Sequence, residues 1–107
     1  MSFQTTHGLA FQVSPWHSKP WHRFDVGTCN GLYRMKNKSY EILAIANDKP
    51  GNGQMTDVWE WFEYFCRRDG KGLRVREFFL NPGFKEHLIR RRGFKAEGKD
   101  DVIKHYR

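Results

Sequence analysis

The sequence predicts an α/β fold with a mixed sheet, in a single domain of 107 residues. The segments 26–35 and 40–46 have the composition of strands, and apolar residues alternate along 73–80 as in a third strand. Apolar residues recur at helical spacing along 56–68, between the second and third strands. A strand, a crossover helix and a strand in this order favour parallel neighbours, so we expect the order β-β-loop-α-β-α-β-β.

The first 24 residues are the least regular part of the sequence. We expect residues 1–24 to form an irregular N-terminal arm and residues 25–107 to form the core. The tryptophans of the arm are expected to pack on the body. A metal site is the alternative, but two histidines five residues apart across a proline have no defined ligand geometry. The arm contains the pairs Trp16-His17 and Trp21-His22.

The next segments predict an antiparallel hairpin. The strands 26–35 and 40–46 are joined by 36–39, which has the composition of a turn. The second strand is continuously apolar except at Glu41, as in a buried strand. A loop rich in turn-forming residues follows at 47–54.

The helix 56–68 is expected to begin at Thr56 or Asp57, which are candidate N-caps, and to end at 69–72. It is rich in aromatic residues, so we expect the sheet and the arm to cover it on two sides. A homodimer contact is the alternative. Cys66 is expected to be a buried small hydrophobe. The predicted inner face holds Val58, Trp61, Phe62 and Phe65.

The C-terminal part completes the predicted domain. A second helix is expected to begin at Asn81-Pro82, because proline is tolerated in the first turn, and to end at Gly93. Two closing strands are expected at 94–95 and 102–106, joined by a turn at 97–100.

The chain is basic, with a formal net charge of +7. Basic and acidic residues are equal in number in residues 1–66. Residues 67–107 therefore carry the whole excess of positive charge, most densely at 90–92. These arginines fit either the solvated end of a helix, where the helix dipole favours cations, or a nucleic-acid contact. No segment has the apolar length of a membrane helix, and no signal peptide is readable. Two cysteines without a motif favour a reducing, cytoplasmic location, and a single disulfide between them is the alternative.

The loop 47–54 is a candidate anion cradle. Gly51 and Gly53 lack side chains that would block a ligand, and the loop leads into a helix N-terminus with unpaired N–H groups. The spacing matches neither the Walker loop nor the dinucleotide fingerprint. A tight connection between a strand and a helix would use the same residues, and this alternative stays open.

Two blocks of the sequence resemble the GNAT family of acyl-coenzyme A N-acyltransferases. The frame at 48–53 is similar to the family's pyrophosphate loop, and 81–88 with Arg92-Gly93-Phe94 is similar to its second motif block. The resemblance covers 40–106, about two-thirds of the chain. It implies a compact GNAT-like fold in which the part before the first core strand is shortened.

The resemblance also implies acetyl-coenzyme A as the cofactor. By this analogy, backbone groups of Ile45, Ala46 and Asn47 contact the pantetheine arm. Asn81 contacts the same arm or the splayed strand edge. The implied reaction is direct acetyl transfer to an amine. The residues whose amides are implied to hold the pyrophosphate are Lys49, Gly51, Asn52, Gly53 and Gln54.

The transfer requires a base for the amine proton and an acid for the departing thiolate. Glu41 is the candidate base, and its alternative role is a solvent-facing strand residue. Many members of the family place a tyrosine where this sequence has Leu88 or Ile89, so the adjacent His87 is the candidate acid. Asp48 departs from the Gln or Arg that usually opens the family's loop.

Three functions follow as hypotheses. The first is an N-acetyltransferase acting on an amine-bearing small molecule or a protein lysine. The second is a catalytically inert GNAT-fold interaction or virion-type module, which the missing tyrosine and Asp48 favour. The third is a basic nucleic-acid binder, which rests on the net charge and residues 90–92. No membrane partner is expected.

Overall fold

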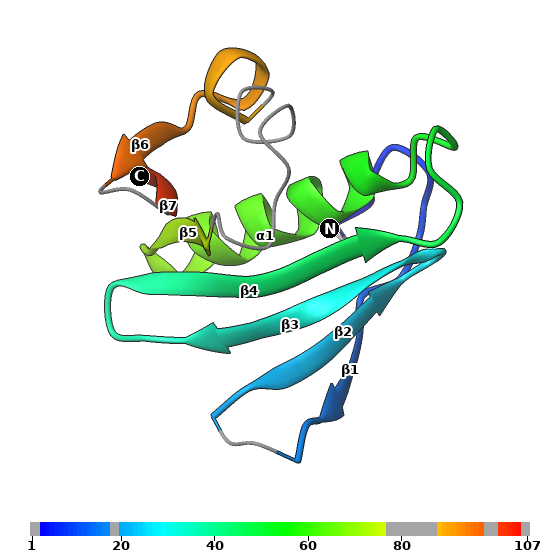
Figure 1. Cartoon of the computed structure of the whole chain (residues 1–107), viewed down its shortest axis with the longest axis horizontal. Coiled ribbons are helices and arrows are strands. Elements are labelled where there is room, and N and C mark those ends of the chain that lie inside the picture. Colours follow the sequence, from blue (N-terminus) through cyan, green and yellow to red (C-terminus); the bar gives the residue numbers. More distant parts are fainter. Residues whose placement is uncertain (1–2, 18–19, 77–87, 98–100, 106–107) are drawn as a thin grey trace.

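The computed structural model describes residues 3–17, 20–76, 88–97 and 101–105 (Figure 1). Within these residues the chain forms a mixed α+β domain with a seven-stranded sheet in the order β1-β2-β3-β4-β5-β7-β6. It has two helices, α1 and a second one described over 88–92. The coarse prediction of a mixed α/β fold is confirmed. The elements are β1 (Gln12–Pro15), β2 (His22–Val26), β3 (Cys29–Met35), β4 (Ser39–Asn47), α1 (Met55–Asp69), β5 (Gly72–Arg76), β6 (Lys95–Glu97) and β7 (Asp101–His105).

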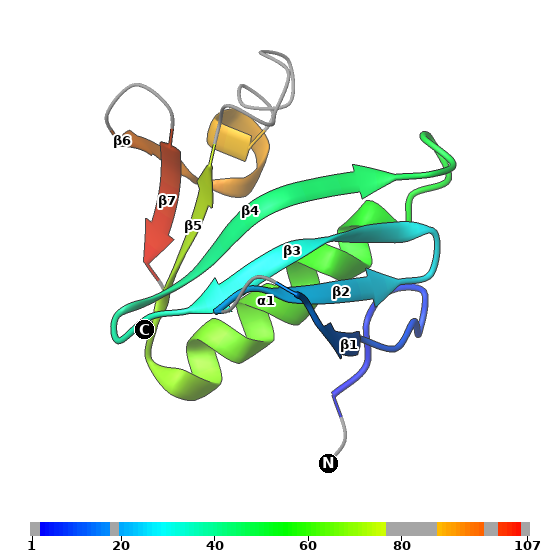
Figure 2. The ribbon, with the colours of Figure 1, turned by 60° about the horizontal axis from the view of Figure 1, so that its bottom comes forward.

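Strands β1 to β4 form an antiparallel meander, and β4 then pairs with β5 in parallel through the crossover helix α1 (Figure 2). The hairpin is confirmed, because β3 pairs with β4 from Cys29↔Asn47 to Met35↔Tyr40. The parallel neighbours are confirmed as well, because a crossover connection returns the chain in the same direction.

The prediction that residues 1–24 are wholly irregular is wrong. Strand β1 and most of β2 lie within this segment and pair from Gln12↔Asp25 to Pro15↔His22. Every residue of β1 is exposed, so burial leaves no alternating pattern in its sequence. The strand is defined by its pairing with β2, and Pro15 is tolerated because β1 lies at the sheet edge.

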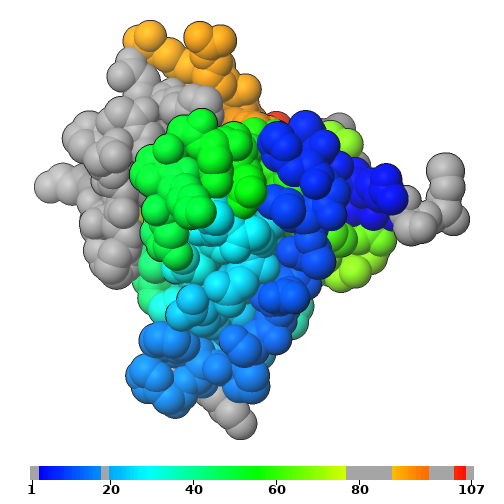
Figure 3. Space-filling view, turned by 90° about the vertical axis from the view of Figure 1, so that its right-hand side faces the viewer, coloured from blue at the N-terminus to red at the C-terminus, as the bar shows by residue number. Residues whose placement is uncertain are grey.

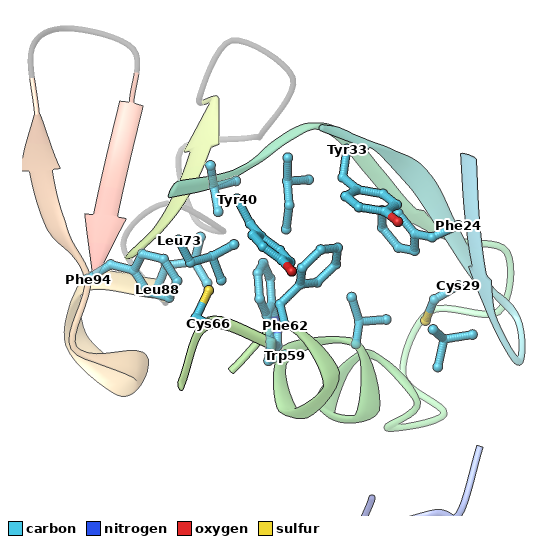
Figure 4. Close-up of a cluster of buried hydrophobic side chains, with 14 residues drawn as sticks. Phe24, Cys29, Tyr33, Tyr40, Trp59, Phe62, Cys66, Leu73, Leu88 and Phe94 are labelled. Atoms are coloured by element: carbon cyan, nitrogen blue, oxygen red, sulfur yellow. The ribbon is translucent and has the colours of Figure 1, made fainter. Parts of the chain in front are cut away.

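The hydrophobic core lies between the sheet and α1 (Figure 4). Phe62 is fully buried, and its ring meets those of Phe24 and Tyr33 edge-on at 5.2 and 5.5 Å between centroids. Leu88 and Phe94 belong to the same core, and Phe94 contacts Trp59 of α1 at 6.0 Å. The described part of the second helix therefore packs on the same side of the sheet as α1.

Helix α1 begins earlier than predicted. Its first residue is Met55, and Gln54 stands at the N-cap position without a side-chain hydrogen bond, so the expected caps Thr56 and Asp57 are wrong. The predicted end is confirmed, because Gly70 adopts a left-handed conformation with φ 67° and its N–H bonds to the Cys66 carbonyl.

Asp57 does not cap the helix, and its side chain binds the N-terminal segment to α1 by hydrogen bonds. Its fully buried carboxylate accepts hydrogen bonds from the Thr5 hydroxyl and from the N–H groups of His7 and Leu9, at 3.1 and 3.2 Å for the latter two. Further along, the indole N–H of Trp61 donates to the Leu9 carbonyl at 2.8 Å. The expected covering of α1 from two sides, by sheet and arm, is confirmed.

The C-terminal predictions hold where the structure describes the chain. Leu73 and Val75 of β5 point into the core at alternate positions. Gly93 follows the second helix with φ 76°, as predicted. The closing strands are β6 and β7, displaced by about one residue from the predicted bounds. The predicted continuation of the third strand over 77–80 and the start of the second helix lie outside the described residues.

Both cysteines are fully buried and carry free thiols. Burial raises the pKa of the Cys66 thiol to about 12 and also raises that of Cys29. Cys66 is therefore the buried hydrophobe that its sequence context predicts. Among the described residues, no helix combines the length and the apolar character needed to span a membrane.

Candidate functional site

Strand β4 is longer than β5, its parallel neighbour in the sheet. It pairs with β3 along its length, but with β5 only from Ser39↔Gly72 to Ile42↔Val75. The β3 register passes from Ile42 directly to Ala44, so Leu43 is the extra residue of a β-bulge. Beyond it, residues 43–47 have no described strand partner on the β5 side. An edge of this kind offers backbone donors and acceptors to an extended ligand.

The half of β4 without a described partner on the β5 side leads directly into the loop 47–54, which lies against the N-terminal segment (Figure 3). His7 Nε2 is 3.1 Å from the Gly53 carbonyl oxygen at this contact. The strand end, the glycines and the helix start of the predicted site follow one another in the chain, and the structure places the loop among them beside the N-terminal segment. Of the three predicted pantetheine contacts, Ile45 packs against the core, Ala46 is exposed and Asn47 is half-buried.

The side chain of Asn47 organises the loop. Its Oδ1 accepts hydrogen bonds from the Thr28 hydroxyl at 2.8 Å and from the Lys49 N–H at 3.0 Å. Its Nδ2 donates to Asn52 Oδ1 at 3.0 Å, and that oxygen also accepts the Gln54 N–H at 3.0 Å. The two asparagines therefore fix the loop from within.

Thr28, in the turn between β2 and β3, anchors the loop from outside. Its N–H donates to Gln54 Oε1 at 2.7 Å, and Asn52 Nδ2 donates to its hydroxyl at 2.8 Å. The sequence predicts a role only for the backbone amides of Asn52 and Gln54, and it gives no role to Thr28. The signal for it is weak, because a threonine in a hairpin turn is common and its partners lie 19 to 26 residues away.

The free amides of the loop belong to its glycines. The N–H groups of Lys49 and Gln54 already donate to asparagine oxygens. No acceptor within the described part of the chain binds the N–H of Gly51 or Gly53, and both residues are exposed with φ of 88° and 80°. A Cβ atom on Gly51 would meet nothing within 4 Å. The space beside the Gly51 Cα atom is therefore open.

These residues fit a phosphate group. Two free N–H groups, the positive end of the α1 dipole and the exposed Lys49 all favour an anion at the loop. The exposed carboxylate of Asp48 opposes it, and its Oδ1 accepts a hydrogen bond from the side-chain Nδ2 of Asn30 at 3.4 Å. The balance of full charges in the loop is neutral, so the amides and the helix supply the net attraction.

Glu41 lies on the opposite face of β4 from the core and is 1% exposed. The expectation of a solvent-facing strand residue is wrong. Its Oε1 accepts hydrogen bonds from Arg34 at 2.9 Å and Arg76 at 3.1 Å, and Lys36 Nζ is 3.4 Å from Oε2. A carboxylate on three cations is a poor acceptor for a further proton, since protonation would break these contacts.

The same contacts determine the ionisation of Glu41. Burial by itself raises the pKa of the carboxyl group, but the hydrogen bond from Arg76 and the charges of Arg34 and Lys36 outweigh it. The pKa therefore lies below its ordinary value of 4.5. The ionised form stabilises the folded protein above that pH, and this contribution is lost as the pH falls through the folded-state pKa.

Replacing Glu41 by glutamine is expected to lower the free energy of unfolding at pH 7 by about 2 kcal/mol, a typical value for hydrogen bonds to charged groups. Denaturant unfolding of both proteins at pH 7 and pH 3 tests this. The difference between them is expected to shrink at pH 3, because below the ordinary pKa of 4.5 the unfolded natural protein binds a proton at this carboxyl group more readily than the folded protein does. A difference that is equal at both pH values would contradict the assignment.

The other predicted site residues divide in two. His87 and Asn81 lie outside the described residues, so their roles stay predictions. Around the Trp-His pairs and elsewhere, the described residues contain no group of three or more His, Cys, Asp or Glu side chains placed so that it could hold a metal ion. Trp21 instead lies under the guanidinium of Arg34, whose Cζ is 4.5 Å from the ring centroid.

Comparison of the chain with protein-family models, curated proteins and solved structures gives no match.

Proposed function

We propose that the protein binds acetyl-coenzyme A along the half of β4 that has no described partner on the β5 side, and that it transfers the acetyl group to an amine. One observation carries the proposal. The half of β4 that has no described partner beside β5 leads into a loop with two free glycine amides at a helix N-terminus. An extended ligand with an anionic end matches this sequence of features. The motif resemblance of 48–53 supports the same ligand.

The proposed binding divides along the ligand. The N–H groups of Gly51 and Gly53, with Lys49, hold the pyrophosphate. Backbone groups of β4 from Ile45 to Asn47 align the pantetheine arm by strand-like hydrogen bonds. Acetyl-coenzyme A would supply the activated thioester. The amine nitrogen attacks the thioester carbonyl carbon, the C–S bond breaks, the amine gives its proton to a base and the thiolate takes one.

The acceptor is an amine on a small molecule or a protein lysine. His87 is the proposed acid for the thiolate, from its position beside Leu88. Glu41 fits the role of base poorly, because Arg34, Arg76 and Lys36 engage it. This observation favours a second candidate function, a protein that binds coenzyme A derivatives or a partner without catalysing transfer.

Thermal unfolding with and without acetyl-coenzyme A tests the binding. A ligand at 100 times its Kd stabilises a protein by about 2.7 kcal/mol, which corresponds to a Tm increase of about 10 °C at this chain length. Replacing Gly51 by alanine is expected to abolish this increase, because the new methyl group distorts the left-handed backbone that presents the free amide.

Gly70 provides a matched control. It also has a positive φ, of 67°, and open space around the position of a Cβ atom, so Gly70→Ala imposes a similar backbone strain at the other end of α1. It is expected to lower the Tm by a similar amount and to keep the full response to acetyl-coenzyme A. No response of the natural protein at millimolar ligand would contradict the proposal.

Catalysis has a separate readout. Release of free coenzyme A thiol in the presence of a mixture of amines, followed with a thiol reagent, measures acetyl transfer. Binding together with thiol release supports the transferase. Binding without release at any amine supports the inert binding protein.

A further inference from the structure

The sheet has a second face that no described helix covers. The core side chains of β2 to β5, such as Phe24, Tyr33, Ile42 and Val75, point toward α1, so their neighbours along each strand point away. We call the side that these neighbours form the open face. Its described members on the central strands are Arg23, Asp25, Asn30, Leu32, Arg34, Glu41, Ala44, Arg74 and Arg76.

The open face is positively charged. Four arginines stand on it against the carboxylates of Asp25 and Glu41, and Lys36 reaches Glu41 at 3.4 Å from the end of β3. Among these described residues of the central strands and Lys36, positive charges exceed negative charges by three. A surface of this sign attracts polyanions and raises their rate of encounter.

A row of side chains crosses the open face from one strand to the next. The Trp21 ring lies 4.5 Å below the Arg34 guanidinium, and Arg34 and Arg76 both donate to Glu41. The buried carboxylate on β4 holds two guanidinium groups in fixed positions, one on β3 and one on β5, the strands on either side of it. Cations that are already ordered lose less conformational entropy when they bind a phosphate.

A hollow of about 130 Å³ lies beside this row on the same face. Trp16 and Leu32 give it apolar walls, and Arg23 and Asn30 give it hydrogen-bonding groups. Leu32 precedes Arg34 by two residues on β3, which places the hollow about 7 Å from the row of cations. An indole with adjacent amide and guanidinium groups suits a nucleobase, which stacks with its ring and hydrogen-bonds with its edge.

We propose that the open face binds single-stranded nucleic acid, with a base in the hollow and phosphates along the row that contains Arg34 and Arg76. An acidic peptide would use the cations alone and would leave Trp16 and Asn30 without a role. Asn30 borders both sites, because its Nδ2 donates to Asp48 Oδ1 of the loop 47–54 at 3.4 Å. The inference uses no residue of that loop, so it does not depend on acetyl-coenzyme A binding.

Fluorescence anisotropy of a labelled 12-nucleotide single-stranded DNA of mixed sequence tests the inference, at 50, 100 and 200 mM salt. The natural protein is expected to bind, with log K falling linearly with log salt concentration. Trp16→Ala is expected to weaken binding about tenfold, because stacking on an aromatic side chain contributes 1–3 kcal/mol per base.

Two variants of equal net charge separate the open face from charge in general. The pair Arg23→Gln and Lys36→Gln removes two cations from the open face, and the pair Arg90→Gln and Arg91→Gln removes two exposed cations from the second helix. The first pair is expected to weaken binding at least tenfold and to reduce the salt slope by about two. The second is expected to change the affinity less than threefold. Thermal unfolding confirms that each variant is folded.

Three results would overturn the inference. The first is no binding at 50 mM salt, and the second is an equal loss of affinity in the two charge variants. The third is displacement of the DNA by a polyglutamate peptide at the same concentration of negative charge, together with a Trp16→Ala variant that binds the DNA and the peptide as tightly as the natural protein does. That last result would assign the face to an acidic protein segment.

Discussion

Replacing Phe62 by alanine is expected to lower the free energy of unfolding by about 4 kcal/mol, the largest effect of any substitution considered. Its ring is fully buried between α1 and the sheet and contacts Phe11, Phe24, Tyr33 and Tyr40. Rigid aromatic neighbours on several sides cannot move in to fill the space. The substitution therefore loses the free energy of burying the ring and also leaves a cavity, and both effects destabilise the protein. The Tm is expected to fall by about 20 °C.

Denaturant-induced unfolding measures this effect. Met35→Ala serves as the control, because that apolar side chain is 54% exposed and its loss is expected to change stability by less than about 0.5 kcal/mol. Equal effects of the two substitutions would show that Phe62 does not lie at the centre of the core.

Replacing Asp57 by asparagine is expected to lower the free energy of unfolding by about 3 kcal/mol. The carboxylate is fully buried and faces only donors, from Thr5, His7 and Leu9. An asparagine would turn its NH₂ group toward some of these donors and leave them unsatisfied in a buried place. The N-terminal segment is therefore expected to detach from α1 before the core unfolds.

Limited proteolysis under native conditions detects this detachment as faster cleavage within residues 3–11. Glu60→Gln is the matched control, because Glu60 also accepts a hydrogen bond from the segment, the N–H of Thr6 at 3.1 Å, but in an exposed setting. It is expected to cost less than about 1 kcal/mol. Cleavage of Asp57→Asn at the rate of the natural protein would contradict the account of this contact.

The elements that the sequence predicts are those whose burial leaves a pattern. The hairpin of β3 and β4 and the helix α1 bury one face each, so apolar spacing marks them. Strand β1 buries nothing and is defined only by its pairing with β2, which local sequence does not encode. The helix start was misplaced because the side chain of Asp57 bonds to residues about 50 positions away.

The candidate site divides in the same way. The glycines mark the loop in the sequence, because they permit backbone conformations that other residues avoid. The hydrogen bonds among Asn47, Asn52 and Thr28 depend on the meeting of two loops, which composition does not reveal. The burial of Glu41 depends on Arg34 and Arg76 from neighbouring strands, so a lone carboxylate in an apolar run gave no indication of its partners.

A titration of isotope-labelled protein with acetyl-coenzyme A, followed by the backbone amide resonances, tests the central claim most directly. The account predicts that the largest shifts fall within residues 43–54, with Gly51 and Gly53 foremost among them. The amides of Arg23 and Arg34 on the open face are expected to stay unchanged, because neither residue pairs with the segment 43–54. Shifts confined to other parts of the molecule, or none at millimolar ligand, would contradict it.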